Sequence, residues 1–183
     1  GTIVGNVTLN GNAAHTLTLS DGSTLTGTFT GGAGIDTLNL NGGTLSSTVD
    51  MAAGANVVTV NGDFTTGGTF SATGGTIATT VANGGTLTVD HTYTTGAAIL
   101  TVASGGTLDV HGANVVNGGA FTNNGTTLIS DGRTLTAATQ SAGGAGNALT
   151  FEVGTTTAGQ LVLTGGGANL TNTTLTANVS PSA

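Results

Sequence analysis

Apolar and polar residues alternate along this chain in short runs, and the runs recur at a nearly constant interval. Each run ends at a small or polar residue followed by Gly, and successive turns are 20, 20, 22, 21 and 20 residues apart. The turns are Asp21-Gly22, Asn41-Gly42, Asn61-Gly62, Asn83-Gly84, Ser104-Gly105 and Asn124-Gly125. Self-similarity at a fixed spacing is typical of solenoids, in which each repeat packs on its neighbours. The pattern predicts one β-solenoid domain over residues 1–183.

Apolar residues at every second position mark a strand on each side of a turn. Before the turns lie Leu17/Leu19, Leu38/Leu40, Val58/Val60, Val81, Leu100/Val102 and Phe121. After the turns lie Leu25, Leu45, Phe64, Leu87, Leu108 and Leu128. A looser continuation includes Gly143-Gly144, then Leu149 and Phe151, then Leu161/Leu163 before Gly165-Gly166. The repeat therefore predicts eight or nine coils.

A period of 20 to 22 residues accommodates three short strands and three bends in each coil. We predict an all-β fold, a right-handed parallel β-helix, in which inward side chains stack on their counterparts one coil away. The expected inward residues are Leu40, Leu45, Val60, Leu87, Val89, Val102 and Leu108. A second inward stack is expected from Phe29, Val49 and Phe70, which are 20 and 21 residues apart. Substituting Asp for one of these residues should destabilise the fold.

Composition supports strands and Gly-based bends. The chain has 34 Gly and 1 Pro, and it is rich in β-branched Thr and Val. Gly and Asn tolerate the positive φ that a tight bend requires. Asn side chains stacked at one corner can also hydrogen-bond along the axis.

Charge excludes several classes of partner. The net charge is −7, and Arg133 is the one basic residue besides the histidines. Phosphate backbones therefore have no cationic surface to bind, so we expect no nucleic-acid partner. No apolar run approaches the roughly 20 residues of a spanning helix, so the chain is not expected to be membrane-embedded. The chain does not open on a charged segment followed by an apolar core, so we expect any export signal to have been removed or to lie outside this sequence.

Three segments resemble the passenger regions of Gram-negative autotransporters. They are Leu38 to Leu45, Val58 to Phe64 and Leu100 to Val110. The resemblance covers nearly the whole chain, although no membrane barrel follows. It implies a secreted or surface-displayed protein, located outside a Gram-negative cell. The count of 0 Cys and the lack of Lys agree with an extracellular bacterial protein.

Two candidate sites have competing structural interpretations. Gly31 to Leu38 matches the glycine-rich calcium nonapeptide, with Asp36 as its carboxylate. Calcium in such proteins is shared between successive nonapeptides, and the nearest echo, Gly143 to Asn147, lacks the Asp. We therefore expect Asp36 to lie in a glycine-rich bend, and we expect no cofactor and no metal.

The densest ionisable cluster contains Asp90, His91, Asp109 and His111, and repeat alignment places Asp90 directly beneath His111. Such a pair can orient a general base, provided that a nucleophile converges on it. The nearest Ser is Ser104, whose position in the turn explains it better. His15 suggests no chemistry. We expect an exposed Asp–His pair and no catalytic residue.

Enzymes that act on acidic polysaccharides share this architecture, but their chemistry needs cations or paired acids. The remaining acids look dispersed in sequence: Asp21, Asp50, Asp63, Asp131 and Glu152. We predict no enzyme. The leading hypothesis is a structural stalk or fibre; an adhesin-type module that binds a glycan or a host surface protein is the alternative. For a glycan, Tyr93 is the available stacking residue if the Phe side chains are buried.

Both ends of the sequence retain the strand pattern, from Gly1 to Leu9 and from Leu170 to Val179. An uncapped β-helix leaves backbone groups unpaired. We therefore expect either continuation into a longer solenoid or end-to-end self-association.

Overall fold

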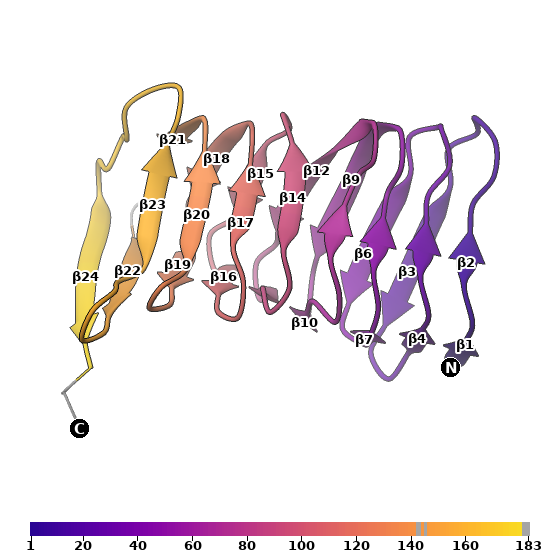
Figure 1. Ribbon diagram of the computed structural model, residues 1–183, viewed down its shortest axis with the longest axis horizontal. Helices are drawn as coiled ribbons and strands as arrows, with labels where there is room; N and C mark the ends of the chain where they lie inside the picture. Colours follow the sequence, from indigo (N-terminus) through magenta and orange to yellow (C-terminus); the bar gives the residue numbers. More distant parts are fainter. Residues whose placement is uncertain (142–143, 145, 181–183) are drawn as a thin grey trace.

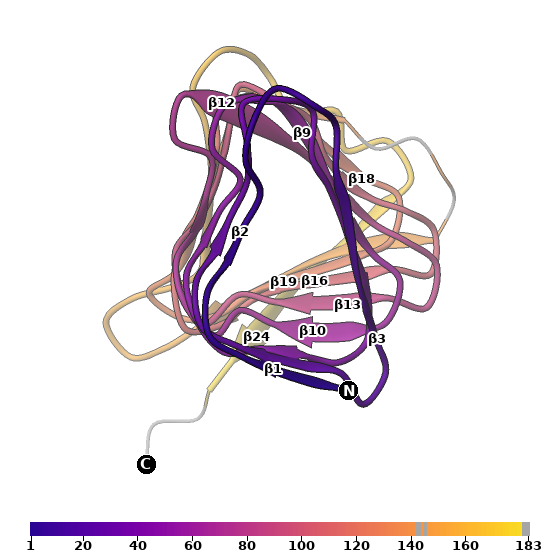
Figure 2. The ribbon, with the colours of Figure 1, turned by 90° about the vertical axis from the view of Figure 1, so that its right-hand side faces the viewer.

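In a computed structural model that describes residues 1–141, 144 and 146–180, the chain forms a parallel β-solenoid of about seven turns. All named strand pairs are parallel, and the strands stack into three faces around a triangular core (Figure 1, Figure 2). Viewed from the N-terminal end in Figure 2, the chain runs clockwise as it recedes, so the coil is right-handed. The predicted fold class is confirmed.

Each complete coil contributes one strand to each face. Face 1 contains β1 (Thr2–Val4), β4 (Thr24–Thr26), β7 (Thr44–Leu45), β10 (Asp63–Thr65), β13 (Thr86–Thr88), β16 (Thr107–Val110), β19 (Thr126–Ile129), β22 (Asn147–Val153) and β24 (Thr173–Val179). Face 2 contains β2 (Val7–Thr8), β5 (Phe29–Thr30), β8 (Val49–Asp50), β11 (Phe70–Ser71), β14 (Tyr93–Gly96), β17 (Val115–Asn117), β20 (Thr134–Ala137) and β23 (Gln160–Leu163). Face 3 contains β3 (Thr16–Ser20), β6 (Thr37–Asn41), β9 (Gly54–Val60), β12 (Gly75–Val81), β15 (Leu100–Val102), β18 (Ala120–Asn123) and β21 (Thr139–Ser141).

The number of turns is slightly lower than the eight or nine predicted. Three-strand coils are complete from β1 through β21. After β21, β22 and β24 continue face 1 and β23 continues face 2. On face 3, within the described residues, the next coil contributes only a bridge between Ala168 and Gln140. The coil length also varies more than the sequence indicates. Ladder partners are 19 residues apart for Phe121 and Gln140 but 26 apart for Asn147 and Thr173. Gly143, in a predicted turn, lies outside the described residues.

The core consists of apolar columns that follow the predicted registers. All seven residues expected to face inward are buried, and Phe29, Val49 and Phe70 form one ladder column. Leu128 is an exception. The ladder pairs Leu108 with Thr127, so Thr127 points inward and Leu128 lies on the outer side of β19.

The polar-Gly turns stack at the corner between faces 3 and 1, as predicted. The side-chain amide of Asn61 donates to Oδ1 of Asn41 at 2.7 Å, which forms one step of the expected ladder. Gly22, Gly42, Gly84 and Gly105 have positive φ. Gly125 does not, and a Cβ there would instead clash with the carbonyl oxygens of Ala103 and Gly106 from neighbouring turns. This corner thus needs Gly for two reasons, backbone conformation and close approach.

The interior changes character toward the C-terminal turns. The buried polar side chains of the earlier coils, such as Asp36, Asn56 and Thr79, are hydrogen-bonded, but several later ones are not. Within the described part of the chain, polar atoms of Asn123, Thr127, Gln140 and Asn147 have no hydrogen-bond partner. The C-terminal core therefore packs at a higher desolvation cost than the N-terminal core.

Candidate functional site

Asp36 lies at the corner that precedes β6 and is fully buried. Its Oδ2 accepts a hydrogen bond from the amide of Gly32 at 2.6 Å. Its Oδ1 lies 3.1 Å from the backbone nitrogen and 3.1 Å from Nδ1 of His15, one coil earlier. Both carboxylate oxygens are therefore occupied by neighbouring groups of the fold.

The coil above continues this corner column, because Oδ1 of Asn56 accepts from the amide of Asp36 at 2.9 Å. The Asn56 amide group in turn donates to the carbonyl oxygen of Met51 at 3.0 Å. His15, Asp36 and Asn56 thus form a hydrogen-bonded column across three coils. Among the residues described, no group of three or more His, Asp or Glu side chains is arranged to hold a metal ion. The geometry assigns Asp36 a structural role, and the absence of a calcium requirement stays a prediction.

The Asp90–His111 contact is confirmed at the corner between faces 1 and 2. Nδ1 of His111 lies 2.7 Å from Oδ1 of Asp90, and both side chains are partly exposed. The hydrogen bond and the negative charge of Asp90 raise the pKa of His111. His91 is held separately, since its Nδ1 lies 2.9 Å from the carbonyl oxygen of Thr66.

Asp109 and Glu152 extend this cluster. Asp109 lies on the outer side of β16, where burial raises its pKa and the nearby His111 counteracts the rise. The sequence grouped Glu152 with the dispersed acids, and in the structure it lies near enough to this cluster to influence its pKa values. Val110 pairs with Ile129 and Ile129 with Phe151, so Glu152 lies two coils above His111, about 10 Å along the axis. Glu152 also contributes to the raised pKa values of His111 and Asp109.

Ser104 does not join the cluster. It is exposed in the turn before β16, whereas His111 follows the end of that strand. The turn residues Gly105 and Gly106 and the four-residue strand β16 lie between them, and the strand alone spans about 13 Å. The strand holds the hydroxyl and the imidazole at opposite edges of face 1, so they cannot act as a nucleophile and base.

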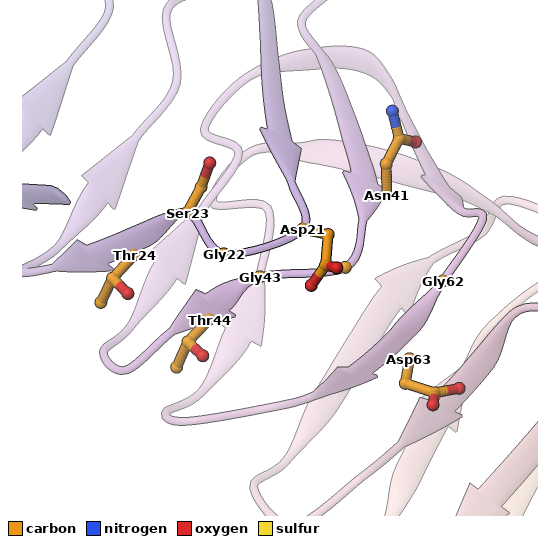
Figure 3. Close-up of a pocket in the computed structure, with 10 residues that line it drawn as sticks. Asp21, Gly22, Ser23, Thr24, Asn41, Gly43, Thr44, Gly62 and Asp63 are labelled. Atoms are coloured by element: carbon orange, nitrogen blue, oxygen red, sulfur yellow. The ribbon is translucent and has the colours of Figure 1, made fainter. Parts of the chain in front are cut away.

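An open hollow of about 610 Å³ lies at the corner between faces 3 and 1 (Figure 3). It lies where face 1 is divided into two sheets, between β7 and β10. Figure 3 shows Asp21 on a turn and Asp63 at the start of β10, in different coils, with carboxylates that do not point toward one another. The remaining lining is mainly Gly, Ser, Thr and Asn. These acids do not form the paired arrangement that glycoside hydrolysis needs.

Tyr93 is not available on the surface, contrary to the sequence-based interpretation. It is 1 % exposed, and its ring stacks on Phe70 with centroids 4.8 Å apart. Its hydroxyl lies 2.8 Å from Oγ1 of Thr79, and burial raises its pKa. Tyr93 therefore continues the column of Phe29, Val49 and Phe70 inside the core.

The raised pKa of His111 gives a testable prediction. Its NMR titration midpoint should lie above 6.5, and Asp90→Asn should return it toward that value. The stabilisation from the pair is complete below pH about 6.5, the unfolded-state pKa, and is lost as pH rises through the folded-state pKa. It should remain below about 1 kcal/mol because the pair is exposed. An unchanged midpoint in the Asp90 variant would show that another group raises the pKa.

No helix with the length and apolar character needed to cross a membrane occurs in the described residues. Comparisons with protein-family models, curated proteins and solved structures found no match to this chain. The autotransporter resemblance therefore remains an expectation from sequence, and the three-sided β-solenoid is what the structure establishes.

Proposed function

We propose that this chain is a structural segment of a secreted or surface-displayed protein of a Gram-negative bacterium and acts as a rigid stalk or fibre. The observation that carries the proposal is the parallel ladder itself, which is unbroken along face 2 from β2 to β23 and along face 3 from β3 to β21, and is interrupted on face 1 between β7 and β10. Backbone hydrogen bonds along the axis, combined with one continuous apolar core, give a rod that resists bending.

A role without catalysis is supported by how the ionisable groups are used. Both carboxylate oxygens of Asp36 are hydrogen-bonded, and strand β16 separates Ser104 from the Asp90–His111 pair. Asp50 is also engaged: burial tends to raise its pKa, but hydrogen bonds from Thr73 and Ala52 outweigh this and lower it. Asp36 and Asp50 thus accept hydrogen bonds that stabilise bends, and Asp90 and His111 form a partly exposed surface pair.

The adhesin alternative has weaker support. The aromatic residues of the chain are Tyr93 and five Phe, and all except the half-buried Phe151 are buried. Stacking on sugar rings needs exposed aromatic faces. A structural role is consequently preferred to glycan binding, and a host surface protein remains the alternative partner.

The proposed mode of assembly is end to end. At the N-terminal end of the described rod, β1, β2 and β3 are edge strands, and at the other end β24, β23 and β21 are edge strands. Ile3 and Val4 are 47 % and 82 % exposed at the first edge, and Leu175 and Val179 are 54 % and 70 % exposed at the last. We propose that these edges are covered by further coils of a longer chain or by a second copy. Docking of unlike ends would be heterologous and would propagate a filament.

Sedimentation velocity and negative-stain electron microscopy over a concentration series test this assembly. Linear oligomers should grow with concentration, and Ile3→Lys should suppress them by placing a charge at the open edge. Thr26→Lys is the matched control, because Thr26 faces outward one coil further in. A chain that stays monomeric while its edge strands are protected from hydrogen exchange would contradict the proposal.

A further inference from the structure

The outer side of face 2 has two straight columns of side chains, one on each side of a buried column. The first column is Asn6, Thr28, Thr48, Thr69, Thr92, Asn114, Thr134 and Gln160. The second column is Thr8, Thr30, Asp50, Ser71, Thr94, Val116, Thr136 and Val162. Nine of these sixteen positions are Thr, so most coils present Thr or a near equivalent beside a buried residue.

Backbone hydrogen bonds fix the alignment of the first column. The amide of Val49 donates to the carbonyl oxygen of Thr69 at 2.8 Å, and the amide of Phe70 donates to that of Thr92 at 2.9 Å. Thr48, Thr69 and Thr92 are therefore successive neighbours along the axis, and all three are exposed. The residues between the columns, including Phe70 and Tyr93, are buried, so alternation along each strand directs the Thr side chains outward.

The two columns define a regular grid. Stacked strands are about 4.8 Å apart, and positions two residues apart on one strand are separated by about 6.7 Å. Face 2 is one unbroken sheet of eight strands, whereas face 1 is divided between β7 and β10. In Figure 2 the coils superpose closely along the side that contains β2, while the strands of face 1 fan out. Such a flat sheet keeps its grid over the length of the rod, which ordinary sheet twist would prevent.

Most side chains of the grid carry a hydroxyl group, and almost none is charged. Each Thr carries a hydroxyl and a methyl group on a side chain whose χ1 is restricted in a strand, so the hydroxyls repeat in fixed positions. Asp50 is the one ionisable residue in the two columns, and its Oδ1 accepts from the amides of Ala52 at 2.9 Å and Thr73 at 2.8 Å. Fixed hydroxyls hold ordered first-layer water, and the methyl groups leave that layer without competing partners.

We propose that face 2 binds the surface of ice. Crystalline water repeats its oxygen atoms along two directions at intervals close to the strand spacing and the two-residue spacing of this grid. An uncharged array of hydroxyl and methyl groups complements an uncharged lattice, whereas exposed ammonium or carboxylate groups would hold hydration shells of a different geometry. Water molecules ordered on face 2 become part of the first ice layer and stop its growth.

Faces 1 and 3 are less suited to this ligand. Face 1 is interrupted and carries Asp63 and Asp109 on its outer side. The two outward columns of face 3 are equally rich in Thr, with eight Thr in fourteen positions, but the second column is apolar across four central coils, at Val57, Ala78, Ile99 and Ala120. Face 3, which has the same backbone spacing, therefore serves as the comparison surface for face 2. The proposal does not depend on the stalk role or on self-association.

Ice-crystal growth in a nanolitre osmometer tests the proposal on the purified full chain. In a solution of the wild-type chain, a seeded ice crystal should not grow over a measurable temperature interval below its melting point. The crystal should also develop flat facets. Thr69→Lys, in the middle of face 2, should abolish most of that interval. Thr80→Lys is the matched control, because Thr80 faces outward on face 3 of the same coil between Thr59 and Thr101. It should retain the wild-type interval.

Circular dichroism establishes that each variant is folded, and Thr136→Lys on β20 replaces Thr69→Lys if the latter does not fold. Ice crystals that grow without facets as soon as a solution of the wild-type chain is cooled below their melting point would overturn the proposal. Equal loss in the Thr80 variant would also overturn it, because the effect would then not belong to face 2. If sedimentation instead shows a dimer that Thr69→Lys dissociates, with no effect of the wild type on ice, face 2 is a contact between copies and the proposal is wrong.

Discussion

Replacing Leu87 with Asp is expected to unfold the middle of the solenoid. Leu87 is fully buried and stacks between Phe64 of the previous coil and Leu108 of the next. An Asp there would place a carboxylate among apolar side chains with no cation nearby. Burial of an unpaired charge is among the most destabilising of single changes, and the loss should be at least about 4 kcal/mol. This is a large share of the stability of an ordinary domain, about 5–15 kcal/mol.

Urea unfolding followed by circular dichroism measures this loss. Thr101→Asp is the matched control, since Thr101 faces outward on face 3 between Thr80 and Thr122. A charge there stays in water, so its effect should remain within about 0.5 kcal/mol. Equal stability of the Leu87 and Thr101 variants would show that Leu87 does not occupy the core.

Removing the Asp36 carboxylate is expected to produce the second large effect. Asp36→Ala would leave the amides of Gly32 and His15 without their acceptors. Each unsatisfied donor that is buried costs about 1–3 kcal/mol, so the free energy of unfolding should fall by about 2–6 kcal/mol. The loss should appear first in the N-terminal coils, which this column joins. Hydrogen exchange resolved by segment measures it.

Asp21→Ala is the control for the loss of a negative charge, because Asp21 is an exposed turn residue. It should change stability by less than about 0.5 kcal/mol. The melting temperature of the wild-type chain should not change on addition of EDTA, because Gly32 and His15 already contact both carboxylate oxygens of Asp36. A large shift with EDTA that is absent in the Asp36 variant would show instead that the carboxylate binds calcium.

The repeat made the fold predictable because a solenoid converts sequence period directly into spatial stacking. Leu87 and Leu108 lie in similar Gly-Gly-Thr-Leu contexts 21 residues apart, and the ladder pairs them. The contact between Asp90 and His111 followed from the same alignment. Side chains were placed correctly wherever the corners kept a constant length.

Errors arose where the corner length changes. Four residues separate β15 from β16, but only Asn124 and Gly125 separate β18 from β19. Because of the shorter corner, Leu108 pairs with Thr127, one position before the Leu128 that the sequence pattern aligns with it. Thr127 therefore points into the core and Leu128 points outward. Tyr93 was misplaced for a related reason, since it lies 23 residues after Phe70, beyond the assumed period. A single sequence does not show where a corner gains or loses a residue.

The His15–Asp36 contact was missed although the 21-residue separation was available in the sequence. The glycine-rich segment before Asp36 resembles a calcium loop because both structures place a carboxylate next to a tight glycine-rich bend. Sequence pattern alone could not decide whether a cation or the neighbouring coil would satisfy that carboxylate. In the structure, the buried amide of Gly32 and the imidazole of His15 contact the two carboxylate oxygens.

The polar interior of the C-terminal turns has a consequence for the order in which the rod comes apart. In a quasi-one-dimensional array, each coil is held by its own packing and by its two interfaces, so unfolding begins at the weakest terminal segment. The unpaired atoms of Asn123, Thr127 and Gln140 reduce the gain from closing coils near one end, whereas Leu25, Leu38 and Leu40 close the other with apolar contacts. Peeling from the C-terminal end should therefore need less free energy than global unfolding, and refolding should nucleate among the apolar coils and propagate toward that end.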